Sequence, residues 1–270
     1  MSAPAVGQVE TTSVAATPTV VSNRFLNKAV IVTGAGSGIG QAVVIRLVAE
    51  GASVFGIDVN EAGLQQTVQL TSQPDRVSIA VVSITDEQQL TEKVNDYVAR
   101  LGHLDALINV AGIIRSSLST DTTLDQFRLV IDTNLVGTYL LCRVCLPHLL
   151  KSKGNIVNTA STAGLHGHPY MAAYAASKGG VIALTKSLAR EYICQGVRVN
   201  AIAPGGTMTP LIASIQFPPE VDPTLFASLS LPDRRMGQPA EIAAVVAMLA
   251  SEDGSFINGA VVQIDGGCHA

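Results

Sequence analysis

A phenol and an ammonium stand four residues apart in the segment YAASK, at Tyr174 and Lys178. The small residues between them favour a helix, on which positions i and i+4 share one face, so the two side chains can share a site. A phenol titrates at about pH 10 in water, and a neighbouring ammonium favours its anion and lowers its pKa. The pair therefore predicts a general acid/base at Tyr174, although a half-buried tyrosine beside a surface lysine has the same spacing.

A glycine-rich turn, TGAGSGIG, follows the apolar run KAVIVT. Its glycines (Gly34, Gly36, Gly38 and Gly40) let the backbone turn sharply and approach a pyrophosphate, whose charge meets the free N–H groups of the next helix. Many strand-to-helix turns use glycine for steric reasons alone. Here Asp58 ends the next strand, where a carboxylate can bind an adenosine ribose, so the pattern predicts a dinucleotide site.

Asp58 also predicts NAD(H) rather than NADP(H), because its charge repels a 2'-phosphate. No lysine or arginine stands in the glycine-rich turn, and Ser37 occupies a position where a basic residue would neutralise that phosphate. The alternative role of Asp58 is to cap the helix expected from Asn60, and the two roles are compatible.

Ser161 ends another β-branched run, NIVNTAS. We expect it at the carboxyl edge of a sheet, where its hydroxyl can bind the oxygen that Tyr174 protonates or deprotonates, although serines at strand ends also form caps and turns. Beside a nicotinamide, the three side chains suit hydride transfer from a secondary alcohol carbon, with the alcohol proton leaving to Tyr174.

The elements that must position these residues alternate along the chain. From Lys28 onward, short β-branched runs are followed by stretches of helical period, which is typical of a parallel sheet with crossover helices. The runs are apolar throughout, as expected when helices cover both faces. Residues 24–270 are therefore predicted to form a single α/β domain, a doubly wound Rossmann fold with a seven-stranded parallel sheet, about six helices and a ligand site at the carboxyl ends of the strands.

Composition excludes several other classes. With 47% hydrophobic and 14% charged residues among 270, the chain suits one domain with a large core. A net charge of -4 and 4% aromatic residues give no basic groove for nucleic acid. Glycine or charge interrupts each apolar run, so we expect no membrane span. Residues 1–23 lack the features of a signal peptide and are expected to be a flexible arm.

Four cysteines are few for this length and favour a reducing, cytoplasmic location. Cys142 and Cys145 form a CxxC inside an apolar helical run, without a Cys/His partner at zinc spacing. We interpret them as core or interface thiols and expect no metal site.

Taken together, the chain resembles the short-chain dehydrogenases/reductases over residues 27–267. The resemblance rests on TGAGSGIG, NVAG, DTNLVGTY, Ser161, YAASK, RVNAIAPGGTMT, RMGQPAEIA and INGAVVQIDGG. It implies a small-molecule alcohol or ketone substrate, and a homo-oligomer (tetramer or dimer) assembled through the helices after the fourth and fifth strands.

The resemblance also implies roles for individual residues. Tyr174 is implied as the catalytic acid/base, and Lys178 as the residue that lowers its pKa and binds the nicotinamide ribose. Ser161 would orient the substrate oxygen, and Asn134 would hold a water that relays the proton through Lys178. The expected cofactor contacts are Gly34, Ser37, Gly38, Ile39, Gly40, Asp58, Val59, Ser83, Ile84, Asn109, Ala111, Gly112, Tyr174, Lys178, Pro204, Gly205, Thr207 and Thr209.

Two positions depart from the family pattern. Val110 replaces an asparagine, a mild change, and Ser83 stands where relatives commonly place an aspartate to bind the adenine amino group. The contact to adenine from Ser83 therefore rests on its hydroxyl alone.

Substrate recognition is expected in two segments. Residues 208–232 are apolar and proline-rich and resemble the family's substrate lid, which suggests an apolar substrate. The segment LHGHPYM brings candidate substrate contacts, each of which loop packing would equally explain: His166, His168, Tyr170 and Met171. Arg115 is either an anion contact at the cleft mouth or a solvated surface residue.

The sequence thus predicts an NAD(H)-dependent oxidoreductase that interconverts a secondary alcohol and a ketone. An NADPH-dependent 3-oxoacyl thioester (acyl carrier protein) reductase is the second possibility, although such reductases often carry a basic residue in the glycine-rich turn. A non-catalytic NAD-binding sensor is the third, although a sensor would be expected to lose the tyrosine, lysine or serine.

Overall fold

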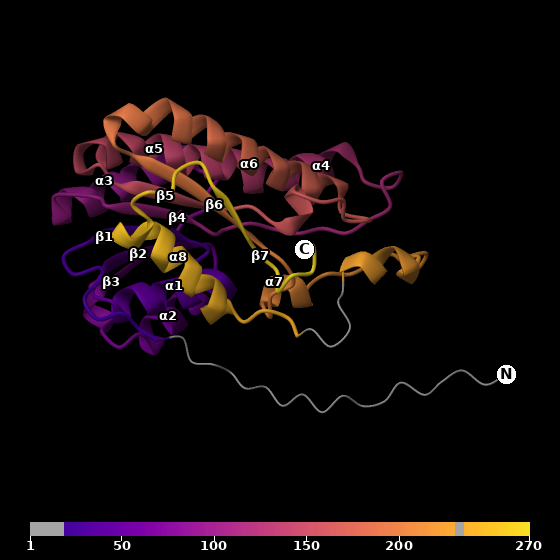
Figure 1. The fold of residues 1–270 in the computed structure, drawn as a ribbon, viewed down its shortest axis with the longest axis horizontal. Helices are drawn as coiled ribbons and strands as arrows, with labels where there is room; N and C mark the ends of the chain where they lie inside the picture. The colour runs from indigo at the N-terminus through magenta and orange to yellow at the C-terminus, as the bar shows by residue number, and fades with distance from the viewer. Residues whose placement is uncertain (1–18, 230–234) are drawn as a thin grey trace.

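Seven parallel strands form one sheet within residues 19–229 and 235–270, which the computed structural model describes (Figure 1). The strand order is β3-β2-β1-β4-β5-β6-β7, as in a doubly wound sheet. The strands are β1 (Ala29–Thr33), β2 (Ser53–Asp58), β3 (Val77–Val81), β4 (Ala106–Asn109), β5 (Asn155–Thr159), β6 (Arg198–Pro204) and β7 (Val261–Ile264). The predicted fold class is confirmed, and the winding reverses between β1 and β4.

Helices cover both faces of the sheet (Figure 1). One layer contains α1 (Gly38–Ala49), α2 (Glu61–Leu70) and α8 (Pro239–Ala250). The other contains α3 (Glu87–Leu101), α4 (Leu124–Ile131), α5 (Gly137–Ser152) and α6 (Ala172–Tyr192). Along β1, Val30 and Val32 pack in the first layer and Ala29 and Ile31 in the second, all fully buried. This explains why the strands are apolar throughout rather than alternating.

The long helix expected over residues 124–150 contains a π-helical turn. Residues Asp132–Val136 form this turn between α4 and α5. Asn134 lies within it and is fully buried. A π-helical turn rotates the side chains that follow it, and such turns often mark functional sites.

The same continuous helical segment corrects one prediction. An 18-residue stretch of Leu124–Ser152 has a mean hydropathy of 1.5, and the helix is long and apolar enough to cross a membrane by length and composition, so the expectation that no apolar run reaches this length was wrong. Half of this apolar stretch is buried inside the domain. Leu141, Cys145 and Leu149 are in the core beneath the sheet, which accounts for the apolar composition without a membrane.

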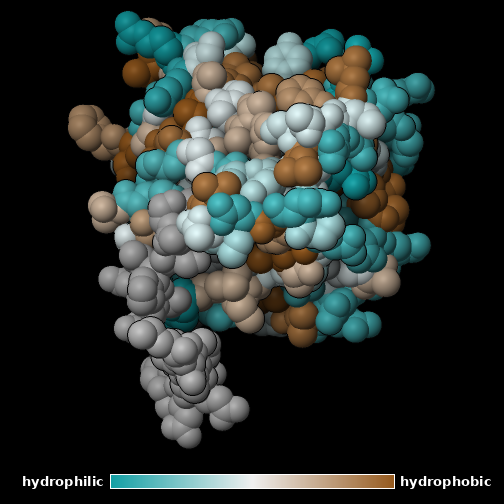
Figure 2. Space-filling model, turned by 90° about the vertical axis from the view of Figure 1, so that its right-hand side faces the viewer, coloured by the Kyte–Doolittle hydropathy of each residue, from teal (hydrophilic) through white to brown (hydrophobic). Residues whose placement is uncertain are grey.

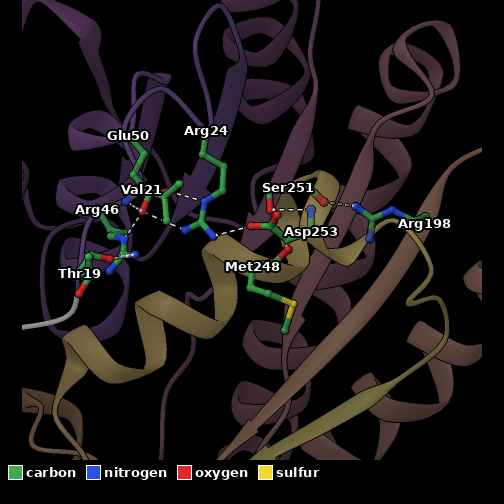
Figure 3. Close-up of polar contacts among 9 residues, drawn as sticks. All are labelled: Thr19, Val21, Arg24, Arg46, Glu50, Arg198, Met248, Ser251 and Asp253. Atoms are coloured by element: carbon green, nitrogen blue, oxygen red, sulfur yellow. Dashed lines mark hydrogen bonds and ion pairs between the residues drawn. The ribbon is translucent and has the colours of Figure 1, made fainter.

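Part of the expected N-terminal arm is bound to the domain. Residues 1–18 lie outside the described residues, but Thr19 O accepts a hydrogen bond of 2.6 Å from Arg46, and the Val21 N–H donates to Glu50 over 3.3 Å. The Glu50 side chain is fully buried and forms ion pairs with Arg24, at 2.7 Å, and with Arg46 (Figure 3). One buried carboxylate therefore joins the segment before β1 to the end of α1.

Glu50→Gln is expected to lower the free energy of unfolding by about 3 kcal/mol, because it leaves two nearly buried guanidinium groups without their shared counter-charge. The measurement is urea unfolding followed by circular dichroism. Asp253→Asn is the matched control, since it removes the exposed partner of Arg24 (57% side-chain exposure) and should change stability by less than about 1 kcal/mol. Equal losses in the two variants would contradict the assignment.

Candidate active site

A cleft of about 450 Å³ opens at the carboxyl end of the sheet. Loops after six strands line it, with contributions from residues 34–39, 58–59, 82–84, 110–114, 159–162 and 204–209. Figure 2 views this side of the molecule, where apolar surface is interspersed with hydrophilic side chains. A larger cavity of about 630 Å³ lies at the opposite edge, beside Arg24, Lys28 and Arg198, and its lining includes no residue that the sequence placed in the site.

Most of the predicted site residues meet in this one cleft. Those that line it are Gly34, Ser37, Gly38, Ile39, Asp58, Val59, Ser83, Ile84, Ala111, Gly112, Ser161, Tyr174, Lys178, Pro204, Gly205, Thr207 and Thr209. Three others do not line it: Gly40, Asn109 and Asn134. A Cβ on Gly40 would lie 2.0 Å from Gly34 O, so this glycine permits close packing of α1 on the turn. Asn109 donates to Asn158 over 2.9 Å and joins β4 to β5.

The glycine-rich turn and Asp58 form one end of the cleft. Gly34 has φ = +67°, and a Cβ there would lie 2.9 Å from the Ala111 backbone. The Asp58 carboxylate accepts hydrogen bonds of 2.9 Å from the N–H groups of Gly36 and Asn60. Asn60, not Asp58, caps α2. Asp58 is thereby fixed against the turn, with lone pairs left for a ribose.

The N-terminus of α1 faces the same end. Ser37 is its N-cap without a side-chain cap bond, and its first turn contains no acidic residue. Free backbone N–H groups without a nearby carboxylate suit a pyrophosphate. These features fit the diphosphate and ribose of a dinucleotide.

Ser161 and Tyr174 lie at the other end. Tyr174 is in the first turn of α6 and is 8% exposed. Burial raises its pKa, and a hydrogen bond with Ser161 acts in the opposite direction. The Ser161 hydroxyl also accepts from the Ala163 N–H at 3.1 Å, so the capping role considered from the sequence coexists with contact to Tyr174.

Lys178 is nearly buried, one turn after Tyr174. Its ammonium donates to Thr159 O at 2.7 Å and lies 5.8 Å from the centre of the Tyr174 ring. Burial lowers the pKa of Lys178 to about 8. The sequence predicted that Lys178 lowers the pKa of Tyr174, but the pKa of Tyr174 is raised because burial outweighs the other influences.

Asn134 positions the catalytic helix. Its Oδ1 accepts from the Ile113 N–H at 2.8 Å, and its Nδ2 donates to Ile113 O at 2.9 Å and to Ser177 Oγ at 3.0 Å. Ser177 Oγ in turn donates to Tyr174 O at 2.7 Å. The amide therefore joins the loop after β4 to the first turn of α6, and the water relay through Lys178 stays a prediction.

Ser83 lines the cleft, but its hydroxyl is engaged nearby. Its Oγ lies 2.8 Å from the Thr85 hydroxyl and accepts from the Thr85 N–H at 3.3 Å. Thr207 and Thr209 bond locally as well, to Gly205 O and Thr207 O respectively. The adenine and carboxamide contacts assigned to these three residues stay predictions.

The predicted lid is only partly described. It begins with α7 (Pro210–Ala213), and a 3-10 segment follows at Pro223–Leu229, whereas residues 230–234 lie outside the described part. The predicted lid contributes Leu211, Ile212 and Ile215 to the cleft. Only the apolar character of the lid signalled this wall. The sequence analysis missed these further lining residues: Val82, Ile113, Ile114, Thr133, Thr159, Ala160, Thr162 and Gly206. Arg115 does not line the cleft.

The CxxC thiols lie in the core, as expected, because Cys142 and Cys145 are buried on α5. Burial raises the pKa of Cys142 to about 12, so this thiol is inert at neutral pH. Within the described residues, no group of three or more histidine, cysteine, aspartate or glutamate side chains is arranged to hold a metal ion.

Lys178→Met is expected to raise the free energy of unfolding by about 2 kcal/mol at pH 7. The reason is that burial destabilises the charged ammonium by more than its one hydrogen bond stabilises it. The unfolded lysine keeps its proton up to its ordinary pKa of 10.5, and the folded one up to about 8. Wild-type stability therefore gains with rising pH in this window, and the difference between the two proteins narrows.

Urea unfolding at pH 7 and pH 10 measures both effects. Lys93→Met, at an exposed site, controls for loss of a surface charge. A Lys178→Met protein less stable than the wild type at pH 7 would show that the contacts of the ammonium outweigh its burial.

Known proteins resemble this chain in sequence and in fold. A family model described as enoyl-(acyl carrier protein) reductase matches residues 34–269. A 3-oxoacyl-[acyl-carrier-protein] reductase of Thermotoga maritima is 37% identical over 246 residues, 90% of this chain and 98% of the relative. A levodione reductase of Leifsonia aquatica is 40% identical over 256 residues, 91% and 96% of the two chains.

Among solved structures, a short-chain dehydrogenase from Mycobacterium paratuberculosis bound to NAD superposes with a TM-score of 0.85 at 28% identity, covering 91% of this chain and 98% of the other. The similarities in sequence and in fold agree. The chain belongs to the short-chain dehydrogenase/reductase family.

Proposed function

We propose that this protein is an NAD(H)-dependent oxidoreductase that interconverts a secondary alcohol and a ketone. The observation that carries the proposal is the meeting, in one cleft, of a fixed carboxylate beside a glycine-rich turn with the hydroxyls of Ser161 and Tyr174 and the ammonium of Lys178. The first group suits a dinucleotide and the second a carbinol oxygen. Both named relatives are reductases, and the solved relative holds NAD.

Charge supports NAD(H) over NADP(H). Asp58 lies where the adenosine ribose is expected, and its carboxylate would repel a 2'-phosphate. Among the described residues that line the cleft, Lys178 is the one lysine or arginine, and it lies at the catalytic end. No basic side chain of the lining is therefore placed to neutralise a 2'-phosphate.

The bound nicotinamide would exchange a hydride with the carbinol carbon, and the protein would handle the proton. Ser161 hydrogen-bonds the substrate oxygen and orients it toward Tyr174. Because burial raises the pKa of Tyr174, the phenol is protonated in the free protein and ready to act as the acid of ketone reduction. Alcohol oxidation needs the phenolate, whose charge the Lys178 ammonium one turn away stabilises.

The wall around Tyr174 suits an apolar substrate skeleton. Met171, Ile113, Ile114 and Ile215 pack with Tyr174 in one apolar cluster.

Assembly as a homo-oligomer stays a prediction from the family resemblance, and a cytoplasmic location stays a prediction from the low cysteine content.

The relationship to 3-oxoacyl-[acyl-carrier-protein] reductases favours a second candidate, reduction of a 3-oxoacyl thioester with NADPH. Asp58 and the missing basic residue argue against NADPH. Assays of acetoacetyl thioester reduction and of cyclohexanol oxidation, each with both cofactors, distinguish the two candidates.

Tyr174→Phe is expected to lower kcat for secondary alcohols by at least about 100-fold, because the variant loses its proton acceptor. The assay follows NADH formation from a panel that includes cyclohexanol. NADH affinity, read by nicotinamide fluorescence, should change by less than about threefold, since the remainder of the cofactor end is untouched.

Tyr139→Phe, which alters an exposed phenol on α5, is the control and should keep its activity. An unchanged rate in Tyr174→Phe would overturn the mechanism. Tight NAD binding without turnover of any alcohol or ketone by the wild type would instead favour a sensor.

A further inference from the structure

Three imidazoles from distant parts of the chain stack beside the cleft. His166 and His168 follow β5, whereas His269 is the penultimate residue. The His269 ring stacks on His166 with centroids 4.2 Å apart and planes 4° apart, and it lies 5.9 Å from His168 at 21°. The C-terminal segment therefore packs against the loop that carries one wall of the cleft.

A carboxylate fixes the third ring. His269 Nδ1 donates to Asp265 at 2.9 Å, and the two side chains are 12% and 7% exposed. Burial opposes ionisation of Asp265, but hydrogen bonds from Gln263, His269 and Gly267 outweigh it and lower its pKa to about 2. Because a carboxylate only accepts, His269 carries a proton on Nδ1 and its ring is held in one orientation.

His168 is the member of the stack that lines the cleft, as do Ser161 and Tyr174. Its Nε2 is sealed from solvent without a hydrogen-bond partner among the described residues, whereas Nδ1 is not sealed. Burial, followed by repulsion from His269 and His166, lowers its pKa to about 4. At neutral pH the ring is uncharged, so Nδ1 can accept or donate a hydrogen bond according to the tautomer.

The surroundings of His168 indicate a function for its Nδ1. The cluster around Tyr174 is apolar. In an apolar pocket, a few fixed polar groups determine how the ligand lies. Ser161 and Tyr174 take the reacting oxygen, which leaves the imidazole of His168 for another polar atom of the same substrate.

We propose that His168 hydrogen-bonds a second oxygen of the substrate, and that His269, held by Asp265, positions the His168 ring. The substrate class is then a diol, hydroxyketone or diketone on an apolar skeleton, rather than a simple alcohol. The inference rests on the proposed alcohol and ketone chemistry at Ser161 and Tyr174.

The test compares cyclohexanol with the 1,2-, 1,3- and 1,4-cyclohexanediols in NAD reduction. The wild type should give at least one diol a kcat/KM about tenfold above that of cyclohexanol, the scale of one hydrogen bond to a buried group. His168→Phe should reduce this ratio to about 1. His166→Phe, the same change two residues earlier at a ring that does not line the cleft, should keep the ratio within about twofold.

The positioning role has its own readout. His269→Ala should raise KM for the favoured diol by about threefold to tenfold with little change in kcat, because the ring of His168 loses its support. His269→Phe retains a ring for the stack and should restore most of the loss. A fall in kcat alone, or no rescue by phenylalanine, would contradict positioning by stacking.

Calorimetric binding of the same alcohols to the Tyr174→Phe protein saturated with NAD separates this inference from the proposed function. Diol-selective binding that His168→Phe abolishes supports the inference even if the wild type turns nothing over, in which case the proposed function fails alone. Equal binding or equal turnover of cyclohexanol and every diol by the wild type overturns the inference. A preference that survives in His168→Phe overturns it as well.

Discussion

The site depends on the hydrogen bonds that hold β1 beside β4, where the winding of the sheet reverses. Val32 pairs with Ile108 in parallel register, and the Thr33 hydroxyl accepts from the N–H groups of Val110 and Ala111, each at 3.1 Å. This contact holds the glycine-rich turn against the loop after β4. Because β5 pairs with β4 in turn, the loop that carries Ser161 opens into the same cleft. Without this register, the two ends of the site would not face one cavity.

The two ends of the cleft depend on different interactions. At the cofactor end, the dipoles of backbone N–H groups and the negative charge of one carboxylate are already fixed in place, so little energy is needed to organise them when a dinucleotide binds. At the catalytic end, a phenol and an ammonium are buried against their preference for water. Burial raises the pKa of Tyr174 and lowers that of Lys178 to about 8, so the two values, which are close together in water, move apart and the lysine becomes the stronger acid. Function is thus maintained at the expense of stability, as is common at active sites.

The sequence predicts local features well and long-range ones poorly. Tyr174, Lys178, Ser161 and the glycine-rich turn were readable because each lies at a fixed position on a periodic element. The direction of the pKa shift of Tyr174 was not, since it depends on burial by distant segments. For the same reason the π-helical turn at Asn134 and the stack on His269 had no local signal. The helical segment Leu124–Ser152 has a strong local signal that is ambiguous, because hydropathy alone does not distinguish a core helix from a membrane span.

The central claim is that the charge of Asp58 makes the protein prefer NAD(H) to NADP(H). Side-by-side titration of the protein with NADH and NADPH, read by nicotinamide fluorescence, tests this claim most directly. The account predicts that NADH binds at least about tenfold more tightly, and that Asp58→Ser reduces this preference by strengthening NADPH binding. Tighter binding of NADPH by the wild type would contradict the role of Asp58 and would make reduction of a 3-oxoacyl thioester the favoured function.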